Sequence, residues 1–210
     1  MEEEVEPQYE SIKITLLGSS GVGKTCIIRR YTENNYEEGS QSTSGASYSQ
    51  KYLEINNRTV QIDLWDTAGQ EKYRSLGRHF YKDAYIVVLV YDITNKESFI
   101  DLKDKWYNDL KNFGEKYTVL AVVGSKSDIF EKEEVPEEDA REFAKSVGAI
   151  FMLTSAKTGD NIEALFDKLV RQYLGPEFLR KVSQIRLDRG DVQKVTHKKA
   201  SKYHKKKKKC

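Results

Sequence analysis

The sequence of 210 residues contains few cysteines and no long apolar segment. Its two cysteines, Cys26 and Cys210, cannot form a disulfide framework, which favours a reducing compartment. No apolar run approaches the roughly 20 residues that a membrane-spanning helix needs. Residues 1–10 lack the apolar stretch of a secretory signal, and Glu2 stands where N-myristoylation requires glycine. These absences argue against a disulfide-rich secreted domain and against an integral membrane protein.

Most of the chain has no excess of positive charge; the basic excess is confined to the last twenty residues. Residues 191–210 contain nine Lys and one Asp, whereas the remainder contains 26 basic and 32 acidic residues. The net charge of +2 therefore hides an acidic body, for which nucleic acid is not the expected partner. We predict an acidic flexible leader at 1–10, one domain at 11–175 and a flexible basic tail at 176–210.

A phosphate-binding pattern organises the domain. Residues 18–25 read Gly-Ser-Ser-Gly-Val-Gly-Lys-Thr, with a strand-like segment at 12–17 before them and a helical segment to about Glu33 after them. Glycines let the backbone wrap around a phosphate chain, and the helix N-terminus adds partial positive charge. Lys24 can reach the β- and γ-phosphates, and the Thr25 hydroxyl can bind Mg²⁺. The alternative, a chance glycine-rich turn, is disfavoured by the flanking strand and helix.

Strand-like and helical segments alternate along the chain. We predict strands at 12–17, 47–55, 58–65, 85–91, 117–124 and 149–153, and helices at 26–33, 96–113, 136–147 and 161–173. Ile100, Leu102, Trp106 and Leu110 are candidate core residues of the second helix, and Asp160 is the expected cap of the last. The alternation predicts an α/β fold, a doubly wound and mostly parallel six-stranded sheet with one antiparallel hairpin strand. Ligands of such sheets bind beyond the carboxyl ends of the strands.

Three further motifs each follow a predicted strand. They are Asp66-Thr67-Ala68-Gly69-Gln70, Ser125-Lys126-Ser127-Asp128 and Thr154-Ser155-Ala156-Lys157. Together with the phosphate loop, their order and spacing from about Ile12 to Tyr173 resemble the Ras-like small GTPases. The runs at 64–76 and 90–95 are most similar to Rab proteins, and 72–76 are closest to endosomal Rabs. The insertion that Rho-type proteins carry after the position of Asp128 is missing.

The resemblance implies roles in GTP hydrolysis. It places Asp66 near Mg²⁺, the Gly69 N–H on the γ-phosphate, and Gln70 where it orients the attacking water. Thr43, in a long polar loop, would bind Mg²⁺ only in the triphosphate state, so that hydrolysis releases this loop. The alternatives are a tight turn at 66–70 and a linker threonine at 43. No arginine finger is identifiable within the chain, which implies slow hydrolysis that a partner accelerates.

The resemblance also implies the contacts with GDP or GTP. Asp128 would accept hydrogen bonds from guanine N–H groups that adenine lacks, Lys126 would lie over the ring, and the Ala156 N–H would meet the guanine oxygen. Tyr36 would pack against the base, unless it only anchors its loop. The full set comprises Ser20, Gly21, Val22, Gly23, Lys24, Thr25, Cys26, Tyr36, Thr43, Gly69, Ser125, Lys126, Asp128, Ser155, Ala156 and Lys157.

The sequence departs from the family pattern at two places. Ser125 replaces an Asn whose side chain ties the base loop to its neighbours, so we predict weaker nucleotide affinity and faster exchange with guanine preference retained. Ser44-Gly45 and Tyr48 replace the usual Ile-Gly and Phe of the first switch. Tyr48, Trp65 and Phe80 match the aromatic triad that Rabs present to effectors; the alternative is ordinary core aromatics.

The lysine run at 205–209 precedes Cys210. On a Rab-like domain this pattern favours prenylation of Cys210, reinforced by attraction of the lysines to an anionic membrane. Rabs usually carry two terminal cysteines, and this chain has one. A solvated charge run or a nuclear-targeting segment is the alternative.

These observations predict a Rab-like GTPase of vesicle trafficking that cycles between GDP and GTP states. It would be a monomer in the cytosol and on the cytosolic face of intracellular membranes, endosomal ones included. Its expected partners are an exchange factor, an activating protein, effectors, and the machinery that transfers prenyl groups and extracts prenylated proteins. One alternative is a nucleotide-binding scaffold with little hydrolysis. Another is a nucleic-acid-binding protein that acts through its lysines.

Overall fold

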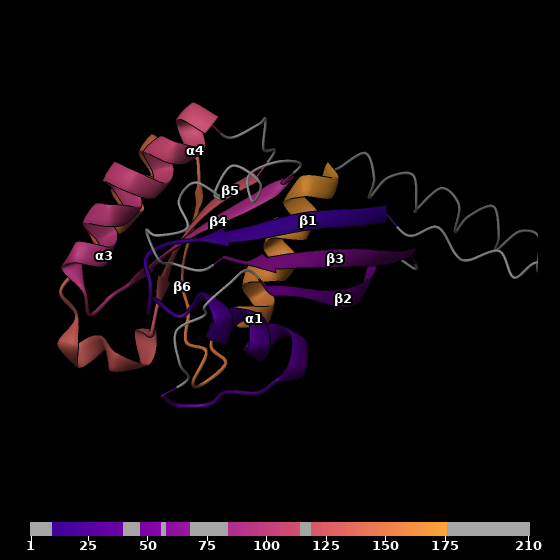
Figure 1. Ribbon diagram of the computed structural model, residues 1–210, viewed down its shortest axis with the longest axis horizontal. Helices are drawn as coiled ribbons and strands as arrows, with labels where there is room; N and C mark the ends of the chain where they lie inside the picture. The colour runs from indigo at the N-terminus through magenta and orange to yellow at the C-terminus, as the bar shows by residue number, and fades with distance from the viewer. Residues whose placement is uncertain (1–9, 40–46, 56–57, 68–83, 114–118, 176–210) are drawn as a thin grey trace, which may run out of the picture. The chain divides into compact units, whose positions relative to one another are not determined.

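A computed structural model of the chain describes residues 10–39, 47–55, 58–67, 84–113 and 119–175. Strands and helices alternate along it (Figure 1). The elements are β1 (Glu10–Leu17), α1 (Lys24–Glu33), β2 (Ser47–Ile55), β3 (Arg58–Asp66), β4 (Ile86–Asp92), α3 (Lys96–Asp101), η2 (Leu102–Tyr107), α4 (Asn108–Phe113), β5 (Val119–Ser125), η3 (Ser127–Lys132), α5 (Glu137–Ser146) and β6 (Ile150–Leu153), followed by a helix at 162–175. Among the described residues, those up to Leu53 and from Thr59 to Tyr173 belong to one compact unit, and Glu54, Ile55, Arg58, Leu174 and Gly175 belong to a second.

The six strands form one sheet in the order β2-β3-β1-β4-β5-β6. All neighbours from β3 to β6 are parallel, and the sheet contains one antiparallel pair. The central strands β4 and β5 are buried along their whole length, as their unbroken apolar sequence predicts. Burial alternates along the edge strand β2, whose second face is exposed. The predicted doubly wound α/β fold is confirmed.

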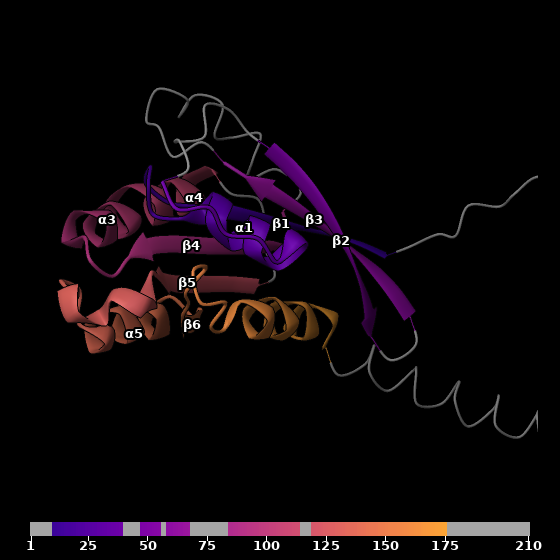
Figure 2. The ribbon, with the colours of Figure 1, turned by 90° about the horizontal axis from the view of Figure 1, so that it is seen from below.

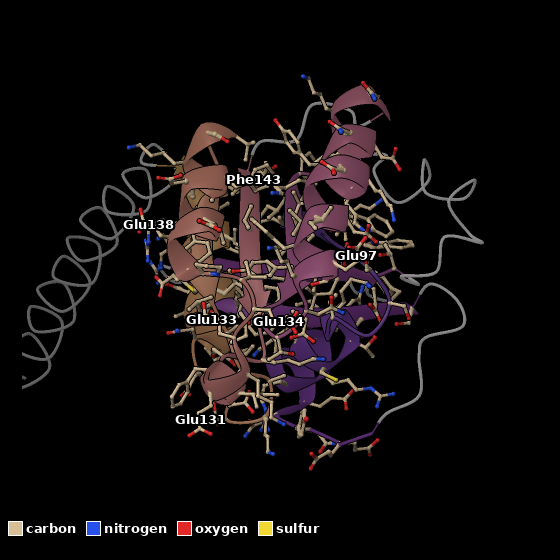
Figure 3. The ribbon with its side chains drawn as sticks, turned by 90° about the vertical axis from the view of Figure 1, so that its left-hand side faces the viewer. Glu97, Glu131, Glu133, Glu134, Glu138 and Phe143 are labelled. Atoms are coloured by element: carbon tan, nitrogen blue, oxygen red, sulfur yellow. The ribbon has the colours of Figure 1, made fainter. Side chains whose placement is uncertain are left out.

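Helices cover both faces of the sheet. On one face, Phe99, Leu102 and Leu110 of the helix at 96–113 pack in one cluster with Ala140 and Ala144 of α5. Figure 3 shows these two helices side by side in front of the sheet. A ring contact joins α1 to the helix at 162–175, where Tyr31 stacks on Phe166 with ring centroids 3.9 Å apart. Figure 2 shows the layers from a second direction.

The helix at 96–113 is interrupted by a π-helical segment, which the sequence did not predict. Its first part, α3, begins at an Asn95 side chain that accepts a hydrogen bond from the Ser98 N–H at 3.1 Å. From Leu102 to Tyr107 the hydrogen bonds run from i to i+5, so the turn widens by one residue. Leu102 and Leu110 are buried as predicted, whereas Ile100 and Trp106 are only half-buried.

Two other local features differ from the prediction. The predicted loop at 125–134 contains the 3₁₀ helix η3. The Asp160 carboxylate accepts a hydrogen bond from the Thr158 hydroxyl at 2.7 Å, and the last helix begins after Asn161, whose φ is +59°. Figure 3 labels Glu131 of η3, Glu133 and Glu134 before α5, Glu138 of α5 and Glu97 of α3. One of them, Glu134, accepts a hydrogen bond from the Lys96 N–H at 3.0 Å, which supplies a negative charge at the N-terminus of α3.

The carboxyl ends of five neighbouring strands lie at one edge of the sheet. Leu16 pairs with Asp66 in register, and Asp92 pairs with Ser125, so the last residues of β3, β4 and β5 meet there. This is the edge at which parallel α/β sheets bind their ligands. Among the described helices, none combines the length and the apolar character needed to cross a membrane.

Candidate nucleotide-binding site

The loop between β1 and α1 turns so tightly that glycine is required at its start. Gly18 has φ of +153°, and a Cβ atom there would lie 2.2 Å from the carbonyl oxygen of Val90. Gly23 has φ of +95° and forms the N-cap of α1, where its carbonyl accepts a hydrogen bond from the Ile27 N–H at 2.9 Å. The predicted phosphate loop therefore leads directly into a helix N-terminus, the geometry that binds anions.

Lys24 lies folded back over this loop. Its Nζ donates to the carbonyl oxygens of Gly18 and Ser19 at 2.8 and 3.0 Å, and only 5% of the residue is exposed. Burial lowers the pKa of the ammonium to about 8, although the negative charge of Asp66 acts in the opposite direction. An anion at the loop would give this buried cation the partner that a low-dielectric position favours.

Thr25 and Asp66 meet at the end of the loop. The Thr25 hydroxyl donates to Asp66 Oδ2 at 2.6 Å, and Asp66 is 1% exposed at the end of β3. A hydroxyl and a carboxylate are hard oxygen donors, the kind that bind Mg²⁺ together with phosphate oxygens. The two described residues of the predicted metal set therefore lie in contact, and their chemistry fits this ion.

A pocket with about 480 Å³ of open space lies beside the loop. Eight of its lining residues belong to the predicted nucleotide set, and three were not foreseen because nothing in their local sequence marks them. The predicted ones are Gly23, Cys26, Tyr36, Ser125, Lys126, Asp128, Ala156 and Lys157, and the additional ones are Ile27, Glu38 and Ile129.

The Asp128 carboxylate is held in place by the loop that follows β6. Its Oδ1 accepts a hydrogen bond from the Ser155 hydroxyl at 2.6 Å, and Ser155 in turn accepts one from the Thr158 N–H at 3.1 Å. Ser155 is fully buried, whereas Asp128 is half-buried and lines the pocket. A fixed carboxylate in a pocket can pair with two adjacent N–H donors of a base.

Ser125 joins three segments with one hydroxyl group. Its Oγ lies 2.5 Å from the carbonyl oxygen of Val22 in the phosphate loop and 2.8 Å from that of Tyr91 in β4. The residue is 3% exposed. A serine hydroxyl has one proton, so it can satisfy only one of these two carbonyls at a time. The link between the loops is therefore present but has one donor fewer than an amide side chain would supply.

Lys126 is bound by a residue that sequence reasoning missed. Its φ is +61°, and its ammonium pairs with Asp92 Oδ2 at 2.5 Å. The other carboxylate oxygen of Asp92 accepts hydrogen bonds from the Thr94 N–H and hydroxyl at 2.9 and 2.8 Å. Asp92 is 6% exposed, so a rigid carboxylate at the end of β4 holds the lysine beside the pocket.

Arg30 connects α1 to the loop that follows β6. Its Nε donates to the Ala156 carbonyl at 2.6 Å, and its Nη2 donates to the Lys157 carbonyl at 2.9 Å. Its Nη1 donates to the Asn34 carbonyl at 3.0 Å. The guanidinium thus uses its planar set of donors to hold backbone groups from distant segments. No motif marks this arginine in the sequence.

Comparison with known proteins decides the family. The family model described as "Ras family" matches residues 13–175. "Ras-related protein Rab-31" of Mus musculus is 42% identical over 168 residues, which cover 79% of this chain and 86% of that protein. "Ras-related protein Rab5A" of Oryza sativa is 40% identical over 167 residues, covering 80% and 82%. "Ras-related protein Rab-30" of Homo sapiens is 40% identical over 154 residues, covering 73% and 75%.

The chain is a Rab-family small GTPase. This Rab binds guanine nucleotides and hydrolyses GTP, as its sequence predicted. The individual roles of its site residues stay predictions. Five predicted residues lie outside the described residues, namely Thr43, Gly69, Gln70, Phe80 and Cys210.

Two residues of the predicted effector triad of this Rab lie in contact. The rings of Tyr48 and Trp65 meet edge to face, with centroids 5.4 Å apart, and 47% of Tyr48 is exposed. The Tyr48 hydroxyl donates to Asp63 Oδ1 at 2.7 Å, and the Lys13 ammonium lies 4.7 Å from the centroid of the Trp65 ring. The tyrosine that replaces the usual phenylalanine thus adds a polar link to an otherwise aromatic surface.

Proposed function

We propose that this Rab alternates between GDP- and GTP-bound states and recruits effectors in vesicle trafficking while GTP is bound. Support comes from one observation above all: the phosphate loop, the Thr25–Asp66 pair and the pocket around Asp128 lie together at one edge of the sheet. A single guanine nucleotide bound there would contact every predicted motif. Effectors would read the nucleotide state through the surface that contains Tyr48 and Trp65.

Selection of guanine would depend on Asp128. The carboxylate, oriented by Ser155, would accept hydrogen bonds from the ring N–H and the exocyclic amine of guanine. Adenine does not present this pair of donors, so binding it would leave a carboxylate without partners. Arg30 supports the same selection, because it fixes the backbone around Ala156, whose N–H would face the guanine oxygen.

Hydrolysis would require Mg²⁺, which neutralises charge on the β- and γ-phosphates when it is bound. Thr25 and Asp66 would hold it, with Thr43 joining them in the triphosphate state. Lys24 would turn from the loop carbonyls to the phosphate oxygens, and Gln70 would orient the attacking water. Because the chain offers no evident arginine finger, intrinsic turnover would be slow and an activating protein would raise it.

Membrane attachment would use the end of the chain. A prenyl group on Cys210 gives weak binding alone, and lysines near an anionic surface add about 1 kcal/mol each. This arrangement would place the GTPase on the cytosolic face of intracellular membranes, including endosomes. An exchange factor, an activating protein and prenyl transfer and extraction proteins would complete its cycle. Mass spectrometry of the protein from its own cells tests the anchor, and an unmodified Cys210 would refute it.

Chromatography of the nucleotide released by heating the purified protein tests the site. We expect GDP or GTP, and recovery of adenine nucleotides or of no nucleotide would contradict the proposal. Phosphate release from added GTP then separates a GTPase from a scaffold that only holds nucleotide, an alternative that the GTPase relatives do not favour. Gln70→Leu is the matched variant, because it should keep the bound nucleotide and slow phosphate release.

A further inference from the structure

A polar cluster connects the phosphate loop to the interrupted helix, outside the predicted nucleotide set. The Ser19 hydroxyl donates to Asp101 Oδ2 at 3.1 Å, and the Trp106 indole N–H donates to the same hydroxyl oxygen at 3.3 Å. Lys105 pairs with the other oxygen of Asp101 at 2.6 Å, and the Asp101 side chain is only 17% exposed. We call Ser19, Asp101 and Trp106 the loop–helix cluster.

The hydrogen bonds of the loop–helix cluster all run in one direction. The Trp106 N–H donates to the Ser19 oxygen, the Ser19 O–H donates to Asp101, and Lys105 neutralises the carboxylate. The serine hydroxyl therefore both accepts and donates. Aligned hydrogen bonds of this kind polarise and strengthen one another, most of all when one member is charged.

Ser19 also contacts the phosphate-binding lysine. Its carbonyl oxygen accepts a hydrogen bond from Lys24 Nζ at 3.0 Å. The side chain of one residue is thus fixed by the helix, while its backbone carbonyl helps to fix Lys24. Any movement of the helix that shifts Ser19 would change the position from which Lys24 meets a phosphate.

The π segment explains how Asp101 and Trp106 reach the same hydroxyl. In a regular α-helix, five residues advance about 500°, so positions 101 and 106 would lie about 140° apart around the axis. The i to i+5 hydrogen bonds of η2 bring positions five apart toward the same side. Straightening this segment into an α-helix would therefore separate the two partners of Ser19. Single π turns inside helices are frequent at functional sites, which agrees with this arrangement.

We propose that Asp101 and Trp106 are positioning residues, which the π segment presents together to hold the phosphate loop through Ser19. The cluster couples the helix at 96–113 to the retention of nucleotide. A partner that binds this helix and reshapes η2 would loosen the loop and accelerate nucleotide release. The inference rests on the proposed function only in that it needs nucleotide in the loop.

Nucleotide release tests the cluster directly. In the full-length protein loaded with a fluorescent GDP analogue, Ser19→Ala removes the hydrogen bond and Asp101→Asn removes the charge that strengthens it. Each variant should therefore release the analogue about 3- to 10-fold faster. Ser19→Thr keeps the hydroxyl and should restore slow release. Asp104→Asn, an exposed acid on the same helix, is the matched control and should leave the rate unchanged.

A double variant separates a connected cluster from independent damage. If the residues act through one chain of hydrogen bonds, Ser19→Ala combined with Asp101→Asn should release GDP no faster than the faster single variant. Unchanged rates in both single variants, or effects that multiply in the double variant, would overturn the proposal. A wild type that retains no guanine nucleotide would overturn the proposed function as well, so the two failures are distinguishable.

Trp106 supplies a spectroscopic measurement that a purely structural role would not affect. The chain has two tryptophans, so Trp65→Phe leaves Trp106 as the only indole. We expect its emission to change when the nucleotide is removed, and Ser19→Ala to abolish that change because the indole N–H loses its acceptor. An emission that does not respond to nucleotide in either protein would count against the coupling.

Discussion

Replacing Ser125 by asparagine tests how the base loop is joined to the phosphate loop. In this Rab, one hydroxyl proton lies between two carbonyl acceptors, 2.5 Å away in Val22 and 2.8 Å away in Tyr91. An asparagine amide carries two protons. Space for it exists toward the pocket, because Ser125 lines that pocket and Gly23 opposite it has no side chain. We therefore expect Ser125→Asn to satisfy both carbonyls and to strengthen nucleotide binding.

The expected change in the rate of GDP release follows from the number of hydrogen-bond donors at position 125. Ser125→Asn adds one hydrogen bond between buried groups, whose net contribution is about 0.5–1.5 kcal/mol. At 25 °C this corresponds to GDP release that is about 2- to 13-fold slower, provided that the bond is lost when the site opens. Ser125→Ala removes the proton altogether, so we expect it to change the rate by a similar factor in the opposite direction.

Release of a fluorescent GDP analogue into excess unlabelled GDP measures both variants beside the wild type. Competition with adenine nucleotides should show that the preference for guanine is unchanged, because Asp128 and Ser155 are untouched. The reasoning would be refuted if Ser125→Asn released GDP at the wild-type rate or faster. A parallel denaturant titration shows whether either substitution alters the stability of the whole domain rather than the site.

Three further predictions concern single residues. Tyr31→Phe should leave the free energy of unfolding unchanged or raise it by up to about 1 kcal/mol in urea titrations, because the buried hydroxyl has no hydrogen-bond partner among the described residues. Burial raises the pKa of the Tyr31 hydroxyl, and nearby negative charges raise it further. Above pH 10 this tyrosine ionises only in the unfolded chain, so the wild type should lose stability there. Tyr31→Phe should lose less stability over the same pH range. Arg30→Lys should weaken GTP binding by about tenfold in calorimetry, since the ammonium keeps only part of the planar donor set and the loss of one charged hydrogen bond costs about 1.5 kcal/mol. The same change at exposed Arg29 should leave binding unaltered. Asp128→Asn presents one donor and one acceptor, so competition assays should show a shift from guanine toward xanthine nucleotides.

The fold could be predicted because its signals are local. The buried run of β4 and the alternation of strands with helices specify a parallel sheet without knowledge of any contact. The π segment could not be predicted, because Leu102 and Leu110 satisfy the spacing of an ordinary amphipathic helix. The same spacing assigns Trp106 to the core, whereas Trp106 lies half-buried in the widened turn.

The site was predictable only in part, for a similar reason. Motif residues such as Lys24 and Asp128 were found because their neighbours along the chain are distinctive. Arg30 and Asp101 have no such neighbours, and their partners lie 126 and 82 residues away in the sequence. Their hydrogen bonds appear only once the sheet has brought separate strand ends together, so no local pattern reveals them.

The pocket draws its walls from α1, the segment around Tyr36 and the loops after β5 and β6. Such a binding site exists only in the folded chain, so the ligand and the fold stabilise each other by mass action. At a free ligand concentration of one hundred times the dissociation constant, bound nucleotide would add about 2.7 kcal/mol to the stability of a domain that is itself worth roughly 5–15 kcal/mol. Each exchange of nucleotide therefore passes through the nucleotide-free protein, which is the form most prone to unfold. A higher cellular concentration of nucleotide shortens the time that the protein spends in this form.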